Sequence, residues 1–325
     1  MFKDLKLWLI LIAAIFCVFG LGLWFGQVSL LELLPQQSET AWLIVHQIRL
    51  PRLLLGLLVG ATLGLSGAVL QGLLRNPLAD PSVIGVSSGA AFGAVCVFYF
   101  GFMHYGSFML PLGGMLGAML SLIVLYFLAG RNPDVTTLIL AGVAINSFTA
   151  AMTALALNLA PNPYAAMEIL FWLMGSLADR SLSDLYWITP LILTGWLLLL
   201  NTARALDSLS LGEEVATSLG FNMGWIKIQA MLGTALCVGA AVALSGNIGF
   251  VGLIIPHLCR PLVAHQPSRL LIVSALAGAL LLLTADFLVR LILLDSGELK
   301  LGVVTALLGA PFFLWLIMQR RPAWS

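Results

Sequence analysis

Two side chains in apolar surroundings, Asp286 and His257, are the first candidates for chemistry in this sequence. A carrier driven by protons or sodium ions needs a titrating carboxylate inside the membrane, and Asp286 lies within a long apolar run. Arg290 follows four residues later, at the spacing that brings two side chains together on one helix face, so an ion pair is the simpler interpretation. His257 has no carboxylate and no second histidine directly beside it in the sequence, which favours packing over a role in an intramembrane enzyme.

The sequence carries no motif for a metal, a disulfide or a nucleotide. Its four cysteines lie far apart in apolar runs without a CxxC pair, which is typical of buried packing. None of its lysines stands in a GxxxxGK[ST] loop, the motif that holds nucleotide phosphates. We therefore expect no cofactor on this chain, and the chain has no energy-coupling site of its own.

Residues 201–225 form a polar stretch between two long apolar segments, in a protein of which only 9% is charged. Within it Leu211, Val215 and Leu219 recur every four residues and Gly220 follows, which predicts a short amphipathic helix that ends at the glycine. The charged residues of the stretch are Arg204, Asp207, Glu213 and Glu214. A polar helix outside the bilayer is either a docking site for a soluble partner or an ordinary solvated loop helix, and the spacing alone leaves both open.

Composition places the chain in the membrane. It is 61% hydrophobic with a mean hydropathy of +1.06, far above a soluble globular domain. The net charge of +1 comes without a basic run or a ladder of aromatic and basic residues, so we expect no nucleic-acid partner. The apolar run 7–31 has no cleavage site of the A-x-A type, which predicts an uncleaved first helix and not a signal peptide.

Charged residues occur only at the breaks between apolar runs, so the breaks mark the ends of membrane spans, each of roughly 20 apolar residues. The predicted spans, about ten in number, are 7–26, 53–74, 87–101, 108–130, 135–158, 185–200, 226–245, 250–263, 270–289 and 302–318. The third and eighth are short and flanked by Gly and Pro, and a further helix at 164–174 is too short to cross. We expect an all-α polytopic membrane protein with one transmembrane domain over residues 1–325.

Basic residues set the orientation, because cytosolic loops of membrane proteins are enriched in Lys and Arg. With the N-terminus inside, ten basic residues face the cytosol: Lys3, Lys6, Arg75, Arg131, Arg204, Lys227, Arg260, Arg269, Arg320 and Arg321. Five face outward: Arg49, Arg52, Arg180, Arg290 and Lys300. Both termini and the polar stretch are therefore predicted to be cytosolic.

Small and polar residues recur at helical spacing within several spans. Close glycines let two helix backbones approach each other in lipid, which predicts tight packing. These glycines are Gly56, Gly60 and Gly64 in one span and Gly113 and Gly117 in another. A stripe of small and polar residues faces either another helix or a water-accessible path, and both alternatives stay open. The stripes are Gly142, Asn146, Thr149 and Thr153 in the fifth span, and Gly302, Thr305, Gly309 and Phe312 in the tenth.

Several motifs occur in a fixed order along nearly the whole chain. They are RLPR (49–52), SGAVLQGLLRNPLADPSVIGVSSGA (66–90), FWLMGSLADRS (171–181), SLGEEVATSLG (210–220), SGNIGFVGLIIPHLCR (245–260), TADFLVR (284–290) and GVVTALLGAPFF (302–313). In this order and spacing the chain resembles the membrane permeases of ABC importers for iron chelates (siderophores), haem and cobalamin, the cobalamin importer permease among them.

The resemblance implies a homodimer of ten-helix subunits with one substrate path on the two-fold axis. It also implies two cytosolic ATPase subunits, which bind ATP and Mg²⁺, and a periplasmic substrate-binding protein on the outer side. Helices two to five and seven to ten would be related as inverted repeats. The setting would be a bacterial inner (plasma) membrane, with this chain as the transport subunit and not the enzyme.

The resemblance further implies roles for particular residues. Coupling to the ATPase would fall to Gly212, Glu213, Glu214, Ala216 and Gly220. The cytoplasmic gates would be Asn76 and Leu78 in one loop, and Val135 and Thr136. The translocation path would be lined, together with the tenth span, by Gly142, Asn146, Thr149 and Thr153. The exposed outer arginines that pair with glutamates of the binding protein would be Arg49, Arg52 and Arg290.

One departure from the family pattern concerns the turn before the last span. Where the family has Pro two residues after a Glu, this chain has Lys300 after Glu298 and Leu299, and the lysine adds an outer charge and a backbone donor. The sequence favours an importer permease for a bulky metal chelate, with a ferric siderophore preferred over haem or cobalamin. The competing class is an ion-coupled secondary transporter, which would need a titrating carboxylate near the midplane.

Overall fold

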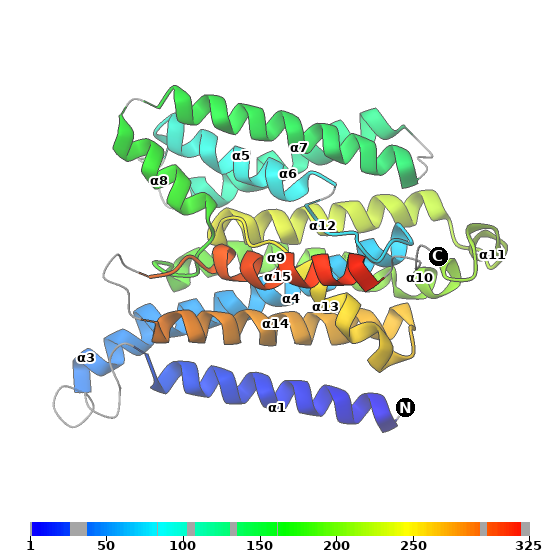
Figure 1. Ribbon diagram of the computed structural model, residues 1–325, viewed down its shortest axis with the longest axis horizontal. Helices are drawn as coiled ribbons and strands as arrows, with labels where there is room; N and C mark the ends of the chain where they lie inside the picture. The colour runs from blue at the N-terminus through cyan, green and yellow to red at the C-terminus, as the bar shows by residue number, and fades with distance from the viewer. Residues whose placement is uncertain are drawn as a thin grey trace.

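The computed structural model describes residues 2–26, 38–82, 84–102, 108–130, 135–160, 162–292 and 298–319, and helix is the only regular secondary structure in these ranges. Long helices run side by side along the longest axis of the molecule (Figure 1). Three of the basic residues predicted to face the cytosol, Arg131, Arg320 and Arg321, lie outside the described residues.

The elements, labelled as in Figure 1, follow the predicted order. The first half of the chain contains α1 (Phe2–Trp24), α3 (Ser38–Leu43), the π-helix η1 (Ile44–Arg49), α4 (Leu50–Leu73), α5 (Val86–Tyr99), α6 (Met109–Ala129), α7 (Val135–Asn158) and α8 (Pro163–Leu173). The second half contains α9 (Leu182–Asn201), α10 (Ala203–Leu209), α11 (Glu213–Ser218), α12 (Met223–Ser245), α13 (Val251–Cys259), the 3₁₀-helix η3 (Arg260–Val263), α14 (Pro267–Leu291) and α15 (Leu301–Gln319). The short helix predicted at 164–174 corresponds to α8.

Seven helices within the described ranges are long and apolar enough to cross a membrane. They are Leu5–Trp24, Glu39–Leu73, Met109–Ala129, Thr136–Asn158, Leu182–Leu209, Met223–Ser245 and Pro267–Leu291. Three shorter apolar helices are Val86–Tyr99, Val251–Val263 and Leu301–Leu316. The all-α membrane fold is thereby confirmed, whereas the count of ten spans stays a prediction.

The short helices α5 and α13 each begin directly after a residue in the left-handed conformation. Gly85, with a φ of 82°, precedes α5, and Phe250, with a φ of 68°, precedes α13. A Cβ at Gly85 would also lie 2.6 Å from a side-chain carbon of Ile145, so there is no room for a side chain there. Because the first residues of both helices, Val86 and Val251, are buried, the irregular backbone before them is covered by protein and not by lipid.

The centre of the bundle is the contact between α4 and α14, which closely spaced glycines make possible. A Cβ at Gly60 would lie 2.4 Å from the carbonyl oxygen of Gly278, and a Cβ at Gly64 would lie 2.0 Å from that of Ser274. The two backbones therefore touch directly, as small residues allow in membranes. The glycines of α6 meet α5 in the same way, so the predicted tight packing is confirmed.

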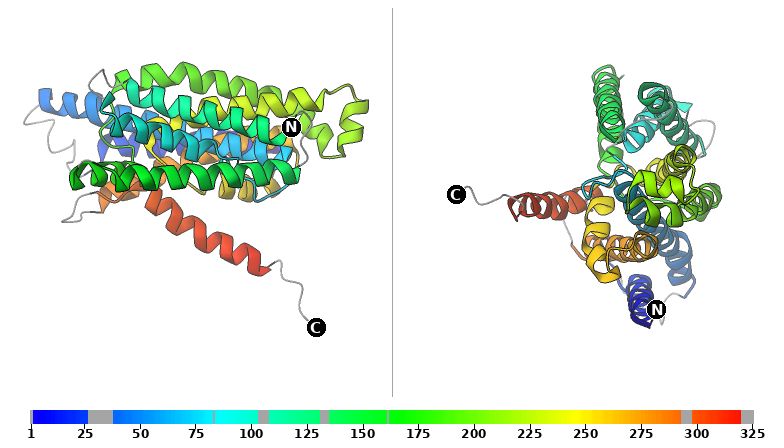
Figure 2. Two further views of the ribbon diagram at one scale, coloured as in Figure 1. Left: turned by 90° about the horizontal axis from the view of Figure 1, so that it is seen from above. Right: turned by 90° about the vertical axis from the view of Figure 1, so that its right-hand side faces the viewer.

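The two ends of the bundle carry different elements. Figures 1 and 2 place α10 and α11 at one end, where α1 also begins, and α3 and α8 at the other. Figure 2 further shows α15 diverging from the remaining helices along its length. The orientation predicted from the basic residues puts α10 and α11 in the cytosol, and this orientation stays a prediction.

We expect Gly64→Ala to destabilise the bundle, because the added Cβ would overlap the Ser274 carbonyl oxygen and push α14 away from α4. The cost should be about 1–3 kcal/mol, the usual range for overpacking, and should lower the midpoint of thermal unfolding in detergent. Gly20→Ala in α1 is the matched control, since no atom lies within 4 Å of its added Cβ. It should keep or slightly raise the midpoint, because Ala favours a helix over Gly. Equal midpoints for both variants would contradict the close contact.

Candidate functional site

A π-helical turn places two of the predicted outer arginines. The turn, η1, joins α3 to α4 and ends at Arg49, while Arg52 lies in the first turn of α4. π-helical turns widen the backbone locally and recur at functional sites. Here both arginines reach neighbouring helices, Arg49 towards α1 and Arg52 towards α14.

Arg52 is the centre of a buried charge cluster. Its Nε donates to Asp286 Oδ1 at 2.9 Å and to Oδ2 at 3.1 Å, and its Nη2 lies 2.8 Å from Oδ1. Its Nη1 and Nη2 also donate to Glu298 Oε2 and Oε1, at 2.9 and 2.7 Å. Such bidentate pairs are the strong and geometrically specific form of arginine–carboxylate recognition. One arginine therefore joins α4, α14 and the segment before α15.

Arg290 and Arg49 extend the cluster to the end of α1. Arg290 Nε lies 3.2 Å from Asp286 Oδ2, and its Nη1 donates to the carbonyl oxygen of Gly22 at 3.1 Å. Arg49 Nη1 donates to the carbonyl oxygen of Leu23 at 2.6 Å. Both carbonyls belong to the last turn of α1, which lacks partners within the helix and carries the negative end of the helix dipole. The arginines therefore also cap α1.

The cluster bears on three expectations from the sequence. The predicted arginines do lie together, but they are buried: Arg49 is 5% exposed, Arg52 9% and Arg290 6%. The expectation that they are exposed is wrong, because each one pairs with a carboxylate or donates to a helix carbonyl of its own chain. The predicted ion pair between Asp286 and Arg290 is confirmed. Glu298 was not among the predicted site residues, and its only signal in the sequence was its place in the unusual turn before α15.

The loop between α4 and α5 carries the predicted gate residues Asn76 and Leu78. Asn76 Oδ1 accepts a hydrogen bond from the Leu78 N–H at 3.0 Å. Asp80 Oδ1 accepts hydrogen bonds from the N–H and the hydroxyl of Ser82, at 2.9 and 2.7 Å. Burial raises the pKa of the Asp80 carboxyl, and the two hydrogen bonds from Ser82 oppose that rise. Two side-chain turns in succession therefore shape this loop.

Asn146 of α7 holds the same loop. Its Nδ2 donates to the Ser82 carbonyl oxygen at 2.6 Å, and its Oδ1 accepts a hydrogen bond from the Ser88 hydroxyl in α5. Thr149 is buried, and its hydroxyl donates to the Ile145 carbonyl oxygen at 2.9 Å within α7. This part of the predicted stripe thus packs against protein, the first of the two alternatives for it. Its role in lining a translocation path stays a prediction.

The remaining predicted gate and path residues also lie on α7. Thr136 in the first turn is exposed, and the side chain of Val135 is outside the described part of the chain. Gly142 is buried and Thr153 is half-buried. Helix α7 therefore begins with one predicted gate and, through Asn146, holds the loop that carries the other.

The polar stretch folds into two short helices, α10 and α11, and not into one. The predicted helix included Leu211, whereas α11 begins at Glu213, after Gly212 with a φ of 124°. Gly220 has a φ of 90°, the left-handed conformation expected at the helix end. Glu213 Oε1 forms an ion pair with Lys227 Nζ at 2.8 Å, which ties α11 to α12.

The apolar ridge of the stretch, Leu211, Val215 and Leu219, points away from the bundle. These side chains are 71%, 40% and 61% exposed. The contact of α11 with its own bundle is made by Ala216, which is fully buried. The ridge is therefore an apolar surface outside the predicted spans, with exposed Glu214 beside it.

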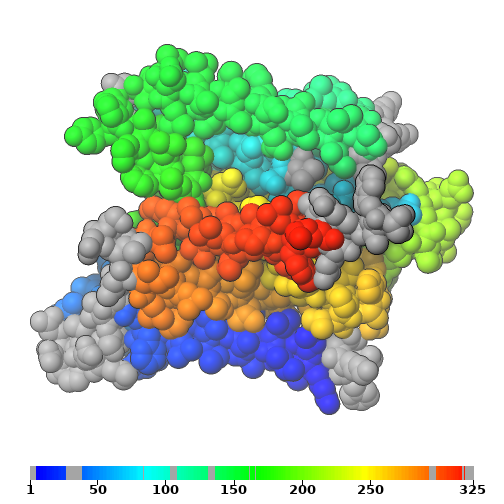
Figure 3. Space-filling model, viewed as in Figure 1, coloured from blue at the N-terminus to red at the C-terminus, as the bar shows by residue number. Residues whose placement is uncertain are grey.

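Figure 3 shows the face of the molecule on which α7 and α15 lie, with a hollow between them. Residues of the gate loop, of the segment before α13 and of α15 form a pocket of about 310 Å³. Its lining is Leu78, Asp80, Ser82, Asn247, Gly249, Phe250, Leu253 and Phe313. Nearby, the ring of His257 packs edge-on against Phe312 with 5.9 Å between centroids, in line with the packing interpretation.

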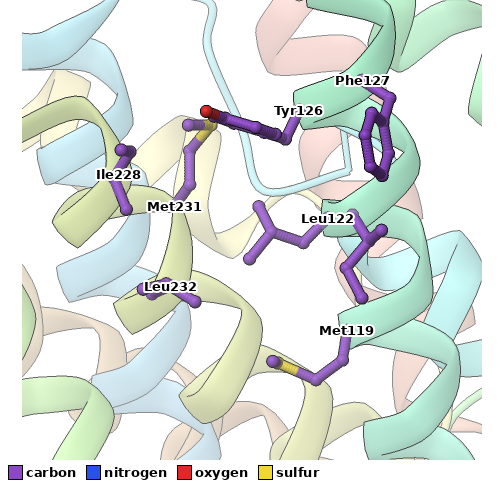
Figure 4. A pocket seen from close by; sticks show the side chains of 8 residues that line it. Met119, Leu122, Tyr126, Phe127, Ile228, Met231 and Leu232 are labelled. Carbon is purple, nitrogen blue, oxygen red and sulfur yellow. The ribbon is translucent and has the colours of Figure 1, made fainter. Parts of the chain in front are cut away.

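A second pocket, of about 390 Å³, lies between α6 and α12 (Figure 4). It is lined by Met119, Leu122, Ile123, Tyr126, Phe127, Ile228, Met231 and Leu232. Its walls are hydrophobic apart from the hydroxyl of Tyr126, and no predicted gate or path residue contributes to it. Such a lining suits lipid chains and not a polar solute.

A model of the FecCD transport family matches residues 8–319. This chain belongs to the FecCD transport family. Its FecCD relatives include the hemin transport system permease protein HmuU of Yersinia pestis, 40% identical over 294 residues that cover 87% of this chain and 86% of the relative. The vitamin B12 import system permease protein BtuC of Vibrio cholerae is 40% identical over 306 residues, covering 92% and 88%.

A solved structure described as an inward-facing conformation of a metal-chelate type ABC transporter superposes with a TM-score of 0.87 at 34% identity. The match covers 97% of this chain and 99% of that chain. The resemblance found in the motifs is thereby confirmed. FecCD membership makes the chain a transport permease subunit of an ABC importer, a class that works with ATPase subunits and a substrate-binding protein.

In this FecCD permease we expect Asn146→Leu to loosen the gate loop without unfolding the bundle, because it removes both hydrogen bonds at nearly constant volume. Amide hydrogen exchange of residues 76–82 should accelerate about tenfold, as the loss of one to two hydrogen bonds implies. Exchange in α12 serves as the internal control and should not change. Unaltered exchange in the loop would show that Asn146 does not hold it.

Proposed function

We propose that this chain is the membrane part of an ATP-driven importer that carries a metal chelate across a bacterial inner (plasma) membrane to the cytosol. Two copies of the chain would enclose one path, with an ATPase subunit against each copy and a binding protein at the outer end. Both chain termini and the polar stretch would face the cytosol. The observation that carries the proposal is the exposed apolar ridge at the end of the bundle opposite the arginine cluster.

The ridge has the properties of a protein docking site. Three apolar side chains share one surface at the tip of the bundle, and exposed carboxylates such as Glu214 border them. Contiguous apolar surface with a polar rim is typical of a contact with a soluble partner. Gly212 and Gly220 end α11 on both sides, and buried Ala216 packs it against the bundle. A movement of the ATPase can therefore be transmitted through α11 to the bundle.

Exposed apolar side chains on α7 and α15 support a second copy as the neighbour across the path. On α7 they are Leu140, Val143, Phe148 and Leu155, and on α15 they are Leu307, Leu308, Leu314 and Trp315. Both helices border the hollow in Figure 3, so a dimer with these helices at its axis would enclose the hollow. The pocket that contains Leu78 would then lie beside the path, at a gate.

The buried cluster argues against the ion-coupled alternative. Asp286 accepts two hydrogen bonds from Arg52 and forms an ion pair with Arg290. Protonation of this carboxylate would leave two buried guanidinium groups with fewer counter-charges, which is energetically costly. We therefore assign Asp286 a structural role and place the energy source on the ATPase subunits.

The substrate class is inferred from the relatives and the sequence together. The sequence favours a ferric siderophore, whereas the relatives are named for hemin and vitamin B12, and the solved neighbour for a metal chelate. Ferric siderophores, haem and cobalamin are all bulky organic complexes of a metal. We therefore keep haem and cobalamin as equal alternatives to a ferric siderophore.

The test is ligand-stimulated ATP hydrolysis by the reconstituted complex. The permease is placed in liposomes with ATPase and binding-protein candidates from the same genome, and ferric siderophores, haemin and cobalamin are offered in turn. We expect one class to raise hydrolysis and to enter the liposomes. Uptake by the permease alone under a proton gradient, abolished by Asp286→Asn, would contradict the proposal.

We expect Gly220→Val to uncouple transport from ATP hydrolysis. The left-handed conformation of Gly220 costs a residue with a Cβ roughly 1 kcal/mol, and a β-branched residue more. Ligand-stimulated hydrolysis should fall roughly tenfold if α11 is misplaced by that energy, while dimer formation stays normal. Gly220→Asn is the matched control, since Asn tolerates this conformation and no atom crowds its Cβ. Equal hydrolysis by the two variants would remove α11 from the coupling pathway.

A further inference from the structure

We propose that Glu298 occupies the site on Arg52 to which a carboxylate of the docking partner binds. The partner's carboxylate displaces Glu298 from Arg52 and thereby releases the start of α15. The inference rests on the proposed function, since it requires a partner that docks at the arginine end of the bundle. It adds an exchange of one carboxylate for another, and a mechanical link from that exchange to a helix of the path.

The contact between Glu298 and Arg52 has the geometry of a recognition site. Both carboxylate oxygens accept hydrogen bonds from the guanidinium, at 2.9 and 2.7 Å, in the paired arrangement by which arginine binds a free carboxylate. The Glu298 side chain is 22% exposed, whereas that of Asp286 is only 2% exposed. An incoming carboxylate can therefore reach the place of Glu298, while Asp286 keeps Arg52 fixed from the inside.

The pair of Glu298 and Arg52 lies beside a pocket that contains a further hydrogen-bond donor. Arg49, Arg52, Arg290 and Glu298 line a pocket of about 240 Å³ together with Gly26, Ile44 and Ile48. Arg290 Nη2 is buried and makes no hydrogen bond with the described residues. The pocket and the donor Nη2 of Arg290 both fit an inserted carboxylate.

Exchange of carboxylates avoids a large energetic cost. A buried guanidinium without a counter-charge is strongly unfavourable, and Asp286 is shared between Arg52 and Arg290, so a second carboxylate is needed beside them before docking as well as after it. Glu298 supplies that carboxylate in the free permease. A docking carboxylate that takes its place leaves Arg52 neutralised throughout, and only a partner with a carboxylate at the correct position gains from the exchange.

Displacement of Glu298 would free the start of α15, because only two residues separate Glu298 from Leu301, the first residue of the helix. In the same segment Lys300 lies over the ring of Phe171 in α8, with Nζ 5.6 Å from the ring centroid. Beyond this start, α15 diverges from the bundle (Figure 2). The start of α15 is thus held by Glu298 and Lys300, apart from the contacts that its middle makes with Phe250 and His257.

Two measurements on the full-length permease in lipid nanodiscs test the proposal. The first is the affinity for its binding protein in wild type, Glu298→Gln and Glu298→Asp. Both variants should bind about tenfold more tightly, because the competing bidentate pair is lost in each. Asp keeps the charge but is one methylene shorter, so tightening in this variant excludes a general charge effect. Glu168→Gln, an exposed carboxylate on α8, is the matched control and should leave affinity unchanged.

The second measurement needs no partner. A nitroxide attached through Val303→Cys in the first turn of α15 reports the mobility of the helix, with the more accessible Cys17 and Cys96 replaced by Ala. Glu298→Gln should raise its mobility, and addition of the binding protein should do the same in wild type. Unfolding midpoints within a few degrees of wild type verify that the variants are folded.

The outcomes separate this proposal from the function on which it rests. If no binding protein binds even the wild type, the docking function fails, and the exchange fails with it. If the wild type binds but Glu298→Gln binds equally or more weakly, the function stands and the exchange is overturned. Unchanged nitroxide mobility in Glu298→Gln overturns the link to α15 in either case.

Discussion

The neutralisation of charge inside an apolar bundle is the constraint on which the arginine end of this permease depends. Arg52 cannot stay buried without a counter-charge, and the two carboxylates that supply it come from α14 and from the segment before α15. Arg290 and Arg49 add the end of α1 through its last carbonyls. Four parts of the chain, from its first helix to the segment before its last, are thus fixed at one point, and their ion pairs and hydrogen bonds leave little freedom in how the helices are aligned.

Below this point the helices are held by shape and not by charge. Glycines such as Gly60 and Gly64 let the backbones of α4 and α14 touch, which makes the centre of the bundle rigid. The segments expected to move differ in kind. The gate loop is held by a few hydrogen bonds through Asn146, α11 by one buried alanine and one ion pair, and the start of α15 by the pair of Glu298 and Arg52. Stiff packing in the middle and weaker contacts at the ends are what a transport cycle requires.

Much of this architecture could be predicted from the sequence, because hydropathy and glycine spacing reflect local physics. The apolar runs predicted the helices, and the short third and eighth spans correspond to α5 and α13. The i,i+4 spacing predicted the pair of Asp286 and Arg290, and Gly220 predicted the helix end. These features depend on neighbours within a few residues. Family motifs extended the prediction to the class of transporter.

What the sequence could not predict depends on contacts between distant segments. Arg52 and Glu298 are 246 residues apart, and their pairing follows only from how the helices pack. For the same reason Arg52 was expected to be exposed and is buried. The four-residue spacing of Leu211, Val215 and Leu219 correctly indicated one face, but not whether the bundle or an unseen partner covers it. Periodicity defines a face of a helix, and only the tertiary structure decides what that face meets.

The π-helical turn before α4 also has a consequence for how this end of the protein can vary. A π turn is in effect an α-helix with one residue inserted, and here it ends at Arg49. Because the wider turn absorbs the extra residue, loss of that residue would restore an unbroken α-helix and leave the preceding chain on the same side of the bundle relative to Arg52. Loss of a second residue would come from a regular α-helix and would rotate the preceding chain by about 100° around the helix axis. This segment should therefore tolerate the loss of one residue but not of two.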